Sequence, residues 1–312
     1  MSNLFILGNG FDIAHGLPTK YSDFHNYLLE NYTVRESTFD INSSILPDGE
    51  EVFNSDELVS FLVRLISETE KDGENWCDIE RSLGRLNFDN YFDDMSYIFD
   101  EEDPFKQARI YEDVSANFRK ATTKIRELFF EWVNTIDISE ISFIPSFYNL
   151  INSEKDVFLT FNYTYVLEEY YDAENVEHIH GTQGDKTIVG HGENGREFDS
   201  YPIGTQLDLA ELHDLLRKNT DEIINHSKHF FDNLRSIKNI YSFGFSFSDV
   251  DLPYIREICK TLDTRSITWF LNDFNYEETA EEFKRKIKEC GFEGQFSVFG
   301  LEEKSPVEAE IK

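Results

Sequence analysis

Short apolar runs alternate with longer amphipathic runs in two separate parts of this chain. The first part is the opening, where the apolar residues 4–7 stop at the turn Gly8-Asn9-Gly10 and an amphipathic run begins near Tyr21. The second part begins at Asp156 and continues to about residue 299. An alternation of this kind predicts right-handed βαβ units, so we expect an α/β fold with a doubly wound, mostly parallel sheet.

The second part of the chain supplies most of the expected sheet. Strands are expected where short runs of Val, Ile, Leu, Phe and Tyr occur, at residues 157–161, 176–180, 187–189, 240–245, 266–271 and 296–299. Helices are expected where the apolar spacing changes to three and four, at residues 163–171, 252–262 and 279–290.

Two stretches between the sheet segments have a purely helical pattern. Apolar residues recur there at three-and-four spacing, first over residues 57–69, 91–99 and 105–136. This pattern predicts a large α-helical insertion at about 50–150 and a second one at about 205–235. We therefore expect one α/β domain that covers residues 1–312 and carries both insertions.

The charge balance excludes several classes of partner. The chain has 61 Asp and Glu against 29 Lys and Arg, a formal charge of -32. Such a surface repels phosphate backbones and anionic lipids, so we expect neither nucleic-acid nor membrane binding. The three cysteines contain no C-x-x-C pair, and no apolar run approaches eighteen residues. We expect a cytoplasmic protein without a disulfide framework, a zinc ribbon or a membrane span.

Chemistry-bearing residues follow several of the expected strands. These segments are residues 7–12 with 16–18, residues 160–164 with 177–181, residues 242–246 with Asp249 and Asp251 behind them, and residues 271–272. The carboxyl ends of parallel strands share one crevice, so residues far apart in the sequence are expected to converge there. Gly8 and Gly10 have no Cβ atom, which would let a phosphate approach the backbone.

These segments carry a resemblance to a known family. The stretches "LFILGNGFDIAHGLPTKYSDF", "TFNYTYVLE", "HIHGT" and "YSFGFSFSDVDLPYI" resemble the AbiH family of bacterial abortive-infection proteins, which act against phages. The same segments, in the same order, resemble a sirtuin-like (DHS-like) NAD-binding core. The resemblance covers residues 3–25, 156–192 and 240–273 and implies a Rossmann-like fold that binds NAD.

The resemblance also implies roles for individual residues. The residues implied to contact NAD are Gly8, Asn9, Gly10, Phe11, Asp12, Gly244, Ser246 and Asn272. Asn162 would lie beside the nicotinamide ribose, and His180 would be the base that polarises it. Glu80, in a Trp-x-Asp-x-Glu segment that recurs in AbiH-like sequences, would stabilise a cationic transition state as a further catalytic residue.

The sequence departs from the sirtuin pattern at Thr164, where sirtuins have Asp, at His25, where they have Arg, and in its lack of zinc cysteines. These departures disfavour protein deacylation and leave hydrolysis of the nicotinamide–ribose bond as the expected activity. That reaction passes through an oxocarbenium-like state and needs a base and an oriented water. Histidine can act as a base near neutral pH, and asparagine can orient water.

Other interpretations stay open at this point. The crevice could bind NAD, ADP-ribose or another nucleotide as a sensor without turnover. A metal hydrolase would use His178, His180 and His191 with a carboxylate, but no supporting carboxylate spacing occurs, and we expect no metal. Structural interpretations exist as well: Asn162 as a helix cap, His180 as an edge histidine, and Glu80 in a charged first helical turn. Asp249 and Asp251 are expected to cap the helix from residue 252, with a place in the crevice as the alternative for Asp251.

The expected partner is a small nucleotide. A phage-derived trigger or a second copy of the chain is a further candidate partner, and the sequence does not distinguish between them.

Overall fold

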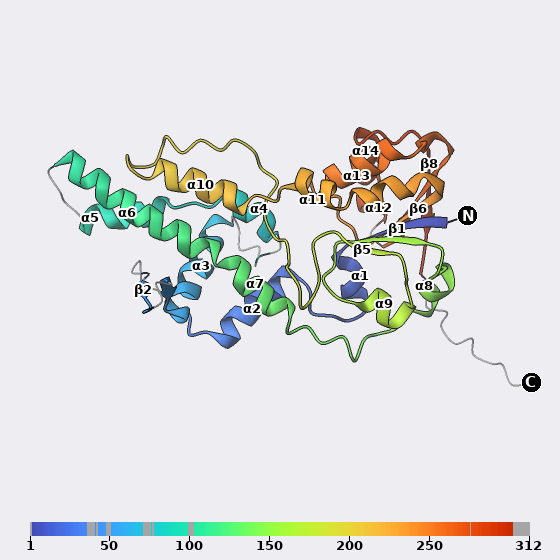
Figure 1. Ribbon diagram of the computed structural model, residues 1–312, viewed down its shortest axis with the longest axis horizontal. Coiled ribbons are helices and arrows are strands. Elements are labelled where there is room, and N and C mark those ends of the chain that lie inside the picture. The colour runs from blue at the N-terminus through green and yellow to red at the C-terminus, as the bar shows by residue number, and fades with distance from the viewer. Residues whose placement is uncertain are drawn as a thin grey trace, which may run out of the picture. The chain divides into compact units, whose positions relative to one another are not determined.

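The computed structural model describes residues 2–35, 41, 43–47, 51–70, 76, 78–98, 103–274 and 276–301. The chain forms two compact units, shown with their elements in Figure 1. Unit 1 consists of Met1–Thr19, Ile136–Thr187 and Asn219–Lys312, and unit 2 consists of Lys20–Thr135 and Ile188–Lys218. The expectation of one domain stays a prediction. Cys77 and the last residue of the predicted helix 91–99 lie outside the described residues.

Unit 1 contains a six-stranded sheet in the order β5-β4-β1-β6-β7-β8, with every neighbouring pair parallel. The strands are β1 (Ser2–Leu7), β4 (Val157–Thr160), β5 (Val176–His178), β6 (Ile237–Phe243), β7 (Thr268–Asn272) and β8 (Gln295–Phe299). Counted along the chain, this is the order 3-2-1-4-5-6 of Rossmann-like folds, and the order reverses between β1 and β6. The predicted fold class, a doubly wound α/β sheet, is confirmed.

Both faces of this sheet are buried, as expected for parallel strands with helices on either side. Along β1, Leu4 and Ile6 belong to a hydrophobic core that also contains residues of α13 (Leu252–Thr261) and Ile287 of α14 (Tyr276–Glu289). Phe5 points to the opposite face. Its ring lies edge-on to the ring of Phe147 in α8 (Pro145–Leu150), with 5.9 Å between the ring centroids. The alternation of aliphatic and aromatic side chains along one strand therefore builds two different cores.

The other helical elements of unit 1 connect these strands. They are α1 (Asn9–Ala14), α9 (Val166–Tyr171), α11 (Thr220–His226), α12 (Lys228–Asp232) and the 3₁₀ turns η1 (Asn233–Ser236) and η2 (Thr264–Ser266). Helix α1 begins directly after Gly8, so the predicted glycine turn is a strand-to-helix junction.

Unit 2 is mainly helical. It contains a short antiparallel hairpin, β2 (Ser43–Ile45) with β3 (Glu51–Phe53). Its helices are α2 (Tyr21–Asn31), α3 (Ser55–Thr69), α4 (Ile79–Gly84), α5 (Asp89–Ile98), α6 (Pro104–Thr123), α7 (Ile125–Val133) and α10 (Gln206–Leu216). Arg119 of α6 binds Asp208 of α10 at 2.8 Å and Glu211 at 3.1 Å, which joins segments that are far apart in the sequence.

Two details of the predicted strands are wrong. Residues 187–189 form no strand; instead, Thr187 and Val189 are buried in a loop, and the Val189 carbonyl accepts a hydrogen bond from Arg126 Nε at 3.2 Å. A run of three residues is too short to distinguish burial in a loop from burial in a sheet. Strand β5 ends at His178 and not at residue 180, because the chain turns at Gly181, whose φ is +84°.

No helix among the described residues is long and apolar enough to cross a membrane.

The loops that follow β1 and β6 touch through their backbones. The Gly8 N–H donates to the Phe243 carbonyl at 3.1 Å, and the Gly10 N–H donates to the Gly244 carbonyl at 3.0 Å. A Cβ atom on Gly8 would lie 2.5 Å from the Gly244 oxygen, and one on Gly10 would lie 2.6 Å from the Gly244 Cα. Close packing of two loops therefore accounts for all three glycines.

We expect Gly244→Ala to lower the free energy of unfolding by about 2–5 kcal/mol, because it combines a left-handed backbone with an overpacked contact. Gly244 has a φ of +64°, and its Cβ would lie 2.4 Å from the Gly10 carbonyl carbon. Gly184→Ala is the matched control, since Gly184 has a φ of +77° with no atom within 4 Å of its Cβ position. The control should lose only about 1–2 kcal/mol in urea unfolding. An equal loss of unfolding free energy in the two variants would show that the contact between the loops does not contribute to stability.

Candidate functional site

All but one of the candidate residues lie in unit 1, beyond the carboxyl ends of its strands. Residues 8–12 follow β1, Asn162 follows β4 and His180 follows β5. Gly244 and Ser246 follow β6, and Asn272 ends β7. The structure thus brings these segments to one edge of the sheet, the edge at which Rossmann-like folds bind their ligands. Their role in NAD binding stays a prediction.

Asn162 is held by three hydrogen bonds and is only 5% exposed. Its side-chain Nδ2 donates to the Gly8 carbonyl at 3.1 Å, and its backbone N–H donates to Thr160 Oγ1, also at 3.1 Å. Its own carbonyl accepts a hydrogen bond from His178 Nδ1 at 2.9 Å. Tyr165, and not Asn162, occupies the N-cap position of α9, so Asn162 is no helix cap. The side chain is held in one orientation, as an orienting group requires.

His178 lies between two acceptors. Its Nδ1 faces the Asn162 carbonyl, and its Nε2 lies 2.8 Å from Glu168 Oε1. A neutral imidazole carries one N–H, so both contacts are hydrogen bonds only if the His178–Glu168 pair holds one further proton. With both nitrogens engaged, His178 has no lone pair to offer a metal ion.

The other histidines of the metal interpretation do not complete a site. His191 belongs to unit 2, where its Nε2 donates to the His213 carbonyl at 2.9 Å and its Nδ1 accepts from the Glu193 N–H at 3.2 Å. Burial lowers the pKa of His191 to about 4. Within the part of the chain that the structure describes, no group of three or more His, Cys, Asp or Glu side chains is arranged to hold a metal.

His180 is paired with a carboxylate. Its Nε2 lies 3.6 Å from Asp251 Oδ1, and both side chains are buried. The rings of Phe161 and Tyr254 lie against the imidazole, with centroids 5.1 Å and 5.7 Å away. A neighbouring carboxylate orients an imidazole and stabilises its protonated form. The pair therefore has the arrangement of a general base with an orienting acid.

Asp251 was expected to cap α13, and that interpretation is wrong for its side chain. The residue occupies the N-cap position, but its side chain makes no capping hydrogen bond. It accepts a hydrogen bond from Ser248 Oγ at 3.0 Å and faces His180. Asp249 is also no cap; it is exposed and pairs with Lys286 at 3.2 Å. The sequence could not separate a helix cap from a carboxylate of the sheet edge, because both are expected at the position directly before a helix that follows a strand.

Asp12 is the most deeply buried acid at this edge, with 1% of its surface exposed. It accepts a hydrogen bond from Thr164 Oγ1 at 2.8 Å. Burial raises the pKa of Asp12 to about 7, against the lowering effects of the Thr164 hydroxyl and of His178. This hydrogen bond connects the segment after β4 to a carboxyl group of α1.

The remaining NAD-contact candidates have structural explanations in the fold. Phe11 is a core aromatic that packs against Phe147 at 5.1 Å. Asn9 donates from Nδ2 to the Thr19 carbonyl at 2.7 Å. Asn272 Oδ1 accepts a hydrogen bond from the Phe274 N–H at 3.1 Å, a local turn. Ser246 is exposed.

Glu80 belongs to unit 2 and forms a buried ion pair. Its Oε1 lies 2.7 Å from the Nζ of Lys218, whose side chain is 0% exposed. Asp78 caps the same helix by accepting a hydrogen bond from the Arg81 N–H at 3.0 Å. The lysine balances the charge of Glu80, which fits a structural role for this carboxylate.

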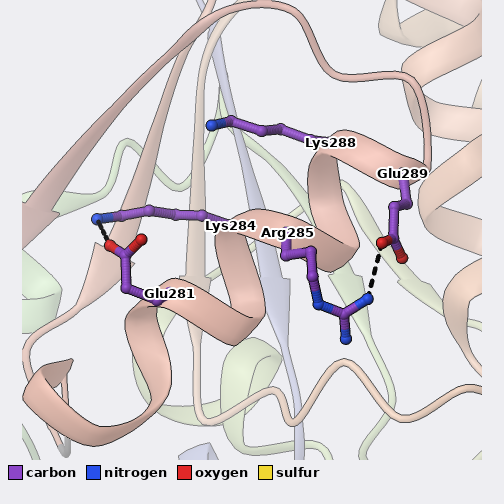
Figure 2. Close-up of a pocket in the computed structure, with 5 residues that line it drawn as sticks. All are labelled: Glu281, Lys284, Arg285, Lys288 and Glu289. Carbon is purple, nitrogen blue, oxygen red and sulfur yellow. Dashed lines mark hydrogen bonds and ion pairs between the residues drawn. The ribbon is translucent and has the colours of Figure 1, made fainter.

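A shallow depression lies on the outer face of α14 (Figure 2). Lys284 pairs there with Glu281 at 2.9 Å, and Arg285 pairs with Glu289 at 2.7 Å. Pairs at this spacing are ordinary on exposed helices and contribute little free energy. None of the candidate residues lines this depression.

Comparison with known proteins identifies one family. The family model "Bacteriophage abortive infection AbiH" matches residues 4–273. The matched region includes every candidate residue of both units. Comparison with curated proteins and with solved structures gave no match.

We expect Lys218→Met to lower the free energy of unfolding by about 3–5 kcal/mol, because it leaves the Glu80 carboxylate buried without its counter-ion. Adding Glu80→Leu should restore most of that loss, since an apolar pair of similar volume replaces the ion pair. Urea unfolding of the single and double variants measures both effects. A double variant that is stable but has lost catalytic turnover would instead assign Glu80 to the chemistry.

Proposed function

Since this chain belongs to the AbiH family of bacteriophage abortive infection proteins, we propose that it is an NAD-consuming hydrolase that cleaves the nicotinamide–ribose bond. The observation that carries this proposal is the buried His180–Asp251 pair, at the same sheet edge as an immobilised Asn162. Depletion of NAD would stop the metabolism of an infected cell, which suits an abortive response.

The proposed reaction needs only water and the dinucleotide. A water oxygen forms a bond to C1 of the nicotinamide ribose while the bond from C1 to the pyridinium nitrogen breaks. The electron pair of that bond neutralises the ring, and nicotinamide leaves. The water loses a proton to the base, so the products are ADP-ribose, nicotinamide and one proton. Positive charge develops on the ribose in the transition state.

Each role falls to a residue whose geometry suits it. His180 is the proposed base, and Asp251, 3.6 Å away, stabilises the imidazolium that forms. Asn162 orients the water or a ribose hydroxyl through its amide, because three hydrogen bonds hold the residue in place. NAD is a substrate in this proposal, and no resident metal is invoked.

A second candidate function is a nucleotide sensor without turnover. His180 is only 4% exposed and packs against two aromatic rings. This burial favours the sensor, since a general base must come within hydrogen-bond distance of the water that it deprotonates. Incubating the purified protein with NAD and measuring nicotinamide and ADP-ribose by chromatography separates the two functions. The hydrolase releases both in equal amounts, without acylated peptide and in the presence of a chelator. A sensor binds NAD and releases neither, with or without lysate from infected cells as a source of trigger.

We expect Asn162→Ala and His180→Ala each to lower kcat by about 10²- to 10⁴-fold, the usual contribution of a general base or a positioned partner. His226→Ala is the matched control, because His226 is exposed on α11. Circular dichroism should show an unchanged fold in all three variants. Near wild-type turnover of either crevice variant would contradict the mechanism.

His178→Phe should lower kcat about tenfold with a smaller change in KM, because it removes the hydrogen bond that holds the Asn162 carbonyl. Glu168→Gln is the conservative comparison. A glutamine amide can donate to Nε2 of a neutral His178, and Nδ1 then still donates to Asn162. Steady-state kinetics should therefore place Glu168→Gln close to the wild type. An equal decrease of kcat in His178→Phe and Glu168→Gln would show that the His178–Glu168 pair acts through its charge and not by holding Asn162.

A further inference from the structure

We propose that Asp12 is a catalytic carboxylate of the crevice and places its negative charge beside the cationic nicotinamide ribose of the substrate. This inference rests on the proposed function and deepens it, since the sequence pattern implied the charge-stabilising role for Glu80. The ligand class is a nucleotide with a positively charged pyridinium ring.

Asp12 lies where three neighbouring strands end. It is in α1, directly after β1, and its Oδ2 accepts from Thr164, which follows β4. His178, at the end of β5, is near enough to act on it electrostatically. In the sheet these strands are adjacent in the order β5-β4-β1, and Asn162 is hydrogen-bonded to Gly8 at the same edge. Asp12 therefore shares the edge with the proposed catalytic residues.

One oxygen of this carboxyl group is unused. Asp12 Oδ1 is buried and has no hydrogen-bond partner within the described residues. Buried carboxyl oxygens are costly to leave without a partner, and such groups are concentrated at functional sites. A ligand that supplies positive charge or a hydrogen-bond donor would complete the environment of Oδ1.

The other acids under consideration are each paired with a basic side chain. Glu80 faces Lys218 at 2.7 Å, Glu168 faces His178 at 2.8 Å, and Asp251 faces His180 at 3.6 Å. The hydrogen bond of Asp12 comes from a neutral hydroxyl. Among these four acids, Asp12 is the one for which the described residues supply no ion pair with a basic side chain, which leaves its charge available to a cationic substrate.

The charge of Asp12 depends on pH near neutrality. Burial raises the pKa of Asp12 to about 7, against the lowering effects of the Thr164 hydroxyl and of His178 in β5, whose Nε2 contacts Glu168 of α9. His15, on the same helix, has a pKa lowered by burial, so it adds no positive charge at neutral pH. The carboxylate is therefore formed as the pH rises through about 7.

The same pKa has a consequence for stability. In the unfolded chain Asp12 ionises near its ordinary pKa of 3.8, while the folded protein keeps the proton up to about 7. The neutral carboxyl group favours the folded state below that ordinary value, and this contribution is lost as the pH rises through the folded pKa. A site residue that destabilises the fold in its active form is common at functional sites.

The first test measures binding by calorimetry. The probes are carba-NAD, a non-hydrolysable analogue that keeps the pyridinium charge, NADH, which lacks that charge, and ADP-ribose, which lacks the ring. At pH 8.5 the wild type should prefer carba-NAD over NADH by about tenfold or more, the effect of an opposite charge within a few ångströms. The preference should disappear at pH 6 and in Asp12→Asn, while ADP-ribose binds equally in both proteins.

The second test needs no nucleotide. Asp12→Asn should unfold at a higher urea concentration than the wild type at pH 8, and the difference should vanish near pH 4. Thr164→Val removes the hydrogen bond that lowers the pKa of Asp12. In the calorimetric test, the preference for carba-NAD over NADH should therefore appear at a higher pH in this variant than in the wild type.

The outcomes separate the two proposals. If the wild type binds none of the three probes and releases no nicotinamide, the proposed function is wrong, and the catalytic role of Asp12 falls with it. If the wild type binds the probes but Asp12→Asn keeps the preference for carba-NAD, the inference alone is wrong. An Asp12→Asn variant less stable than the wild type at pH 8 would show that the ionised carboxylate is a structural group, which also overturns the inference.

Discussion

The backbone contact between the loops after β1 and β6 is the constraint on which the site depends. At the point where the strand order reverses, Gly8, Gly10 and Gly244 bring two main chains together without intervening side chains. This contact positions the Gly8 carbonyl that holds Asn162 and places Asp12 beside Thr164. In a typical dinucleotide fold, glycines at this place leave room for a pyrophosphate. Here the opposite loop lies where a Cβ atom of Gly8 or Gly10 would be, and the residues of the proposed mechanism, Asn162 and His180, follow β4 and β5.

The hydrogen bonds around Asn162 connect the fold to the proposed chemistry. His178 and Thr160 hold its backbone, and Gly8 holds its amide. His180, the proposed base, lies beside Asp251 and packs against the rings of Phe161 and Tyr254. In the proposed mechanism, orientation and acid–base chemistry thus belong to different residues of the H-x-H segment. This division explains why two histidines so close in the sequence have unlike surroundings.

The sequence was sufficient to predict the sheet and the edge at which the candidate residues gather, because apolar periodicity and strand-end position are local properties. It was not sufficient to predict the partners. Thr164 and Asp12 are 152 positions apart, and no local pattern indicates that one would donate to the other. Glu80 was assigned from a motif, while its ion pair with Lys218 depends on the packing of the mainly helical unit 2. The sequence left Asp251 with two interpretations, a helix cap and a crevice acid, because both have the same sequence signal.

The pairing of β1 has a consequence for the synthesis of this protein. Leu4 pairs with Ile240 on one side and with Val157 on the other, so the first strand made must wait for segments that are translated much later. Such non-local pairing slows folding, and domains tend to fold as units while the chain emerges from the ribosome. The His180–Asp251 pair likewise joins residues of two segments that are translated well after β1. A nascent or truncated chain would therefore lack the assembled crevice, and any toxic activity would begin only with the nearly complete polypeptide.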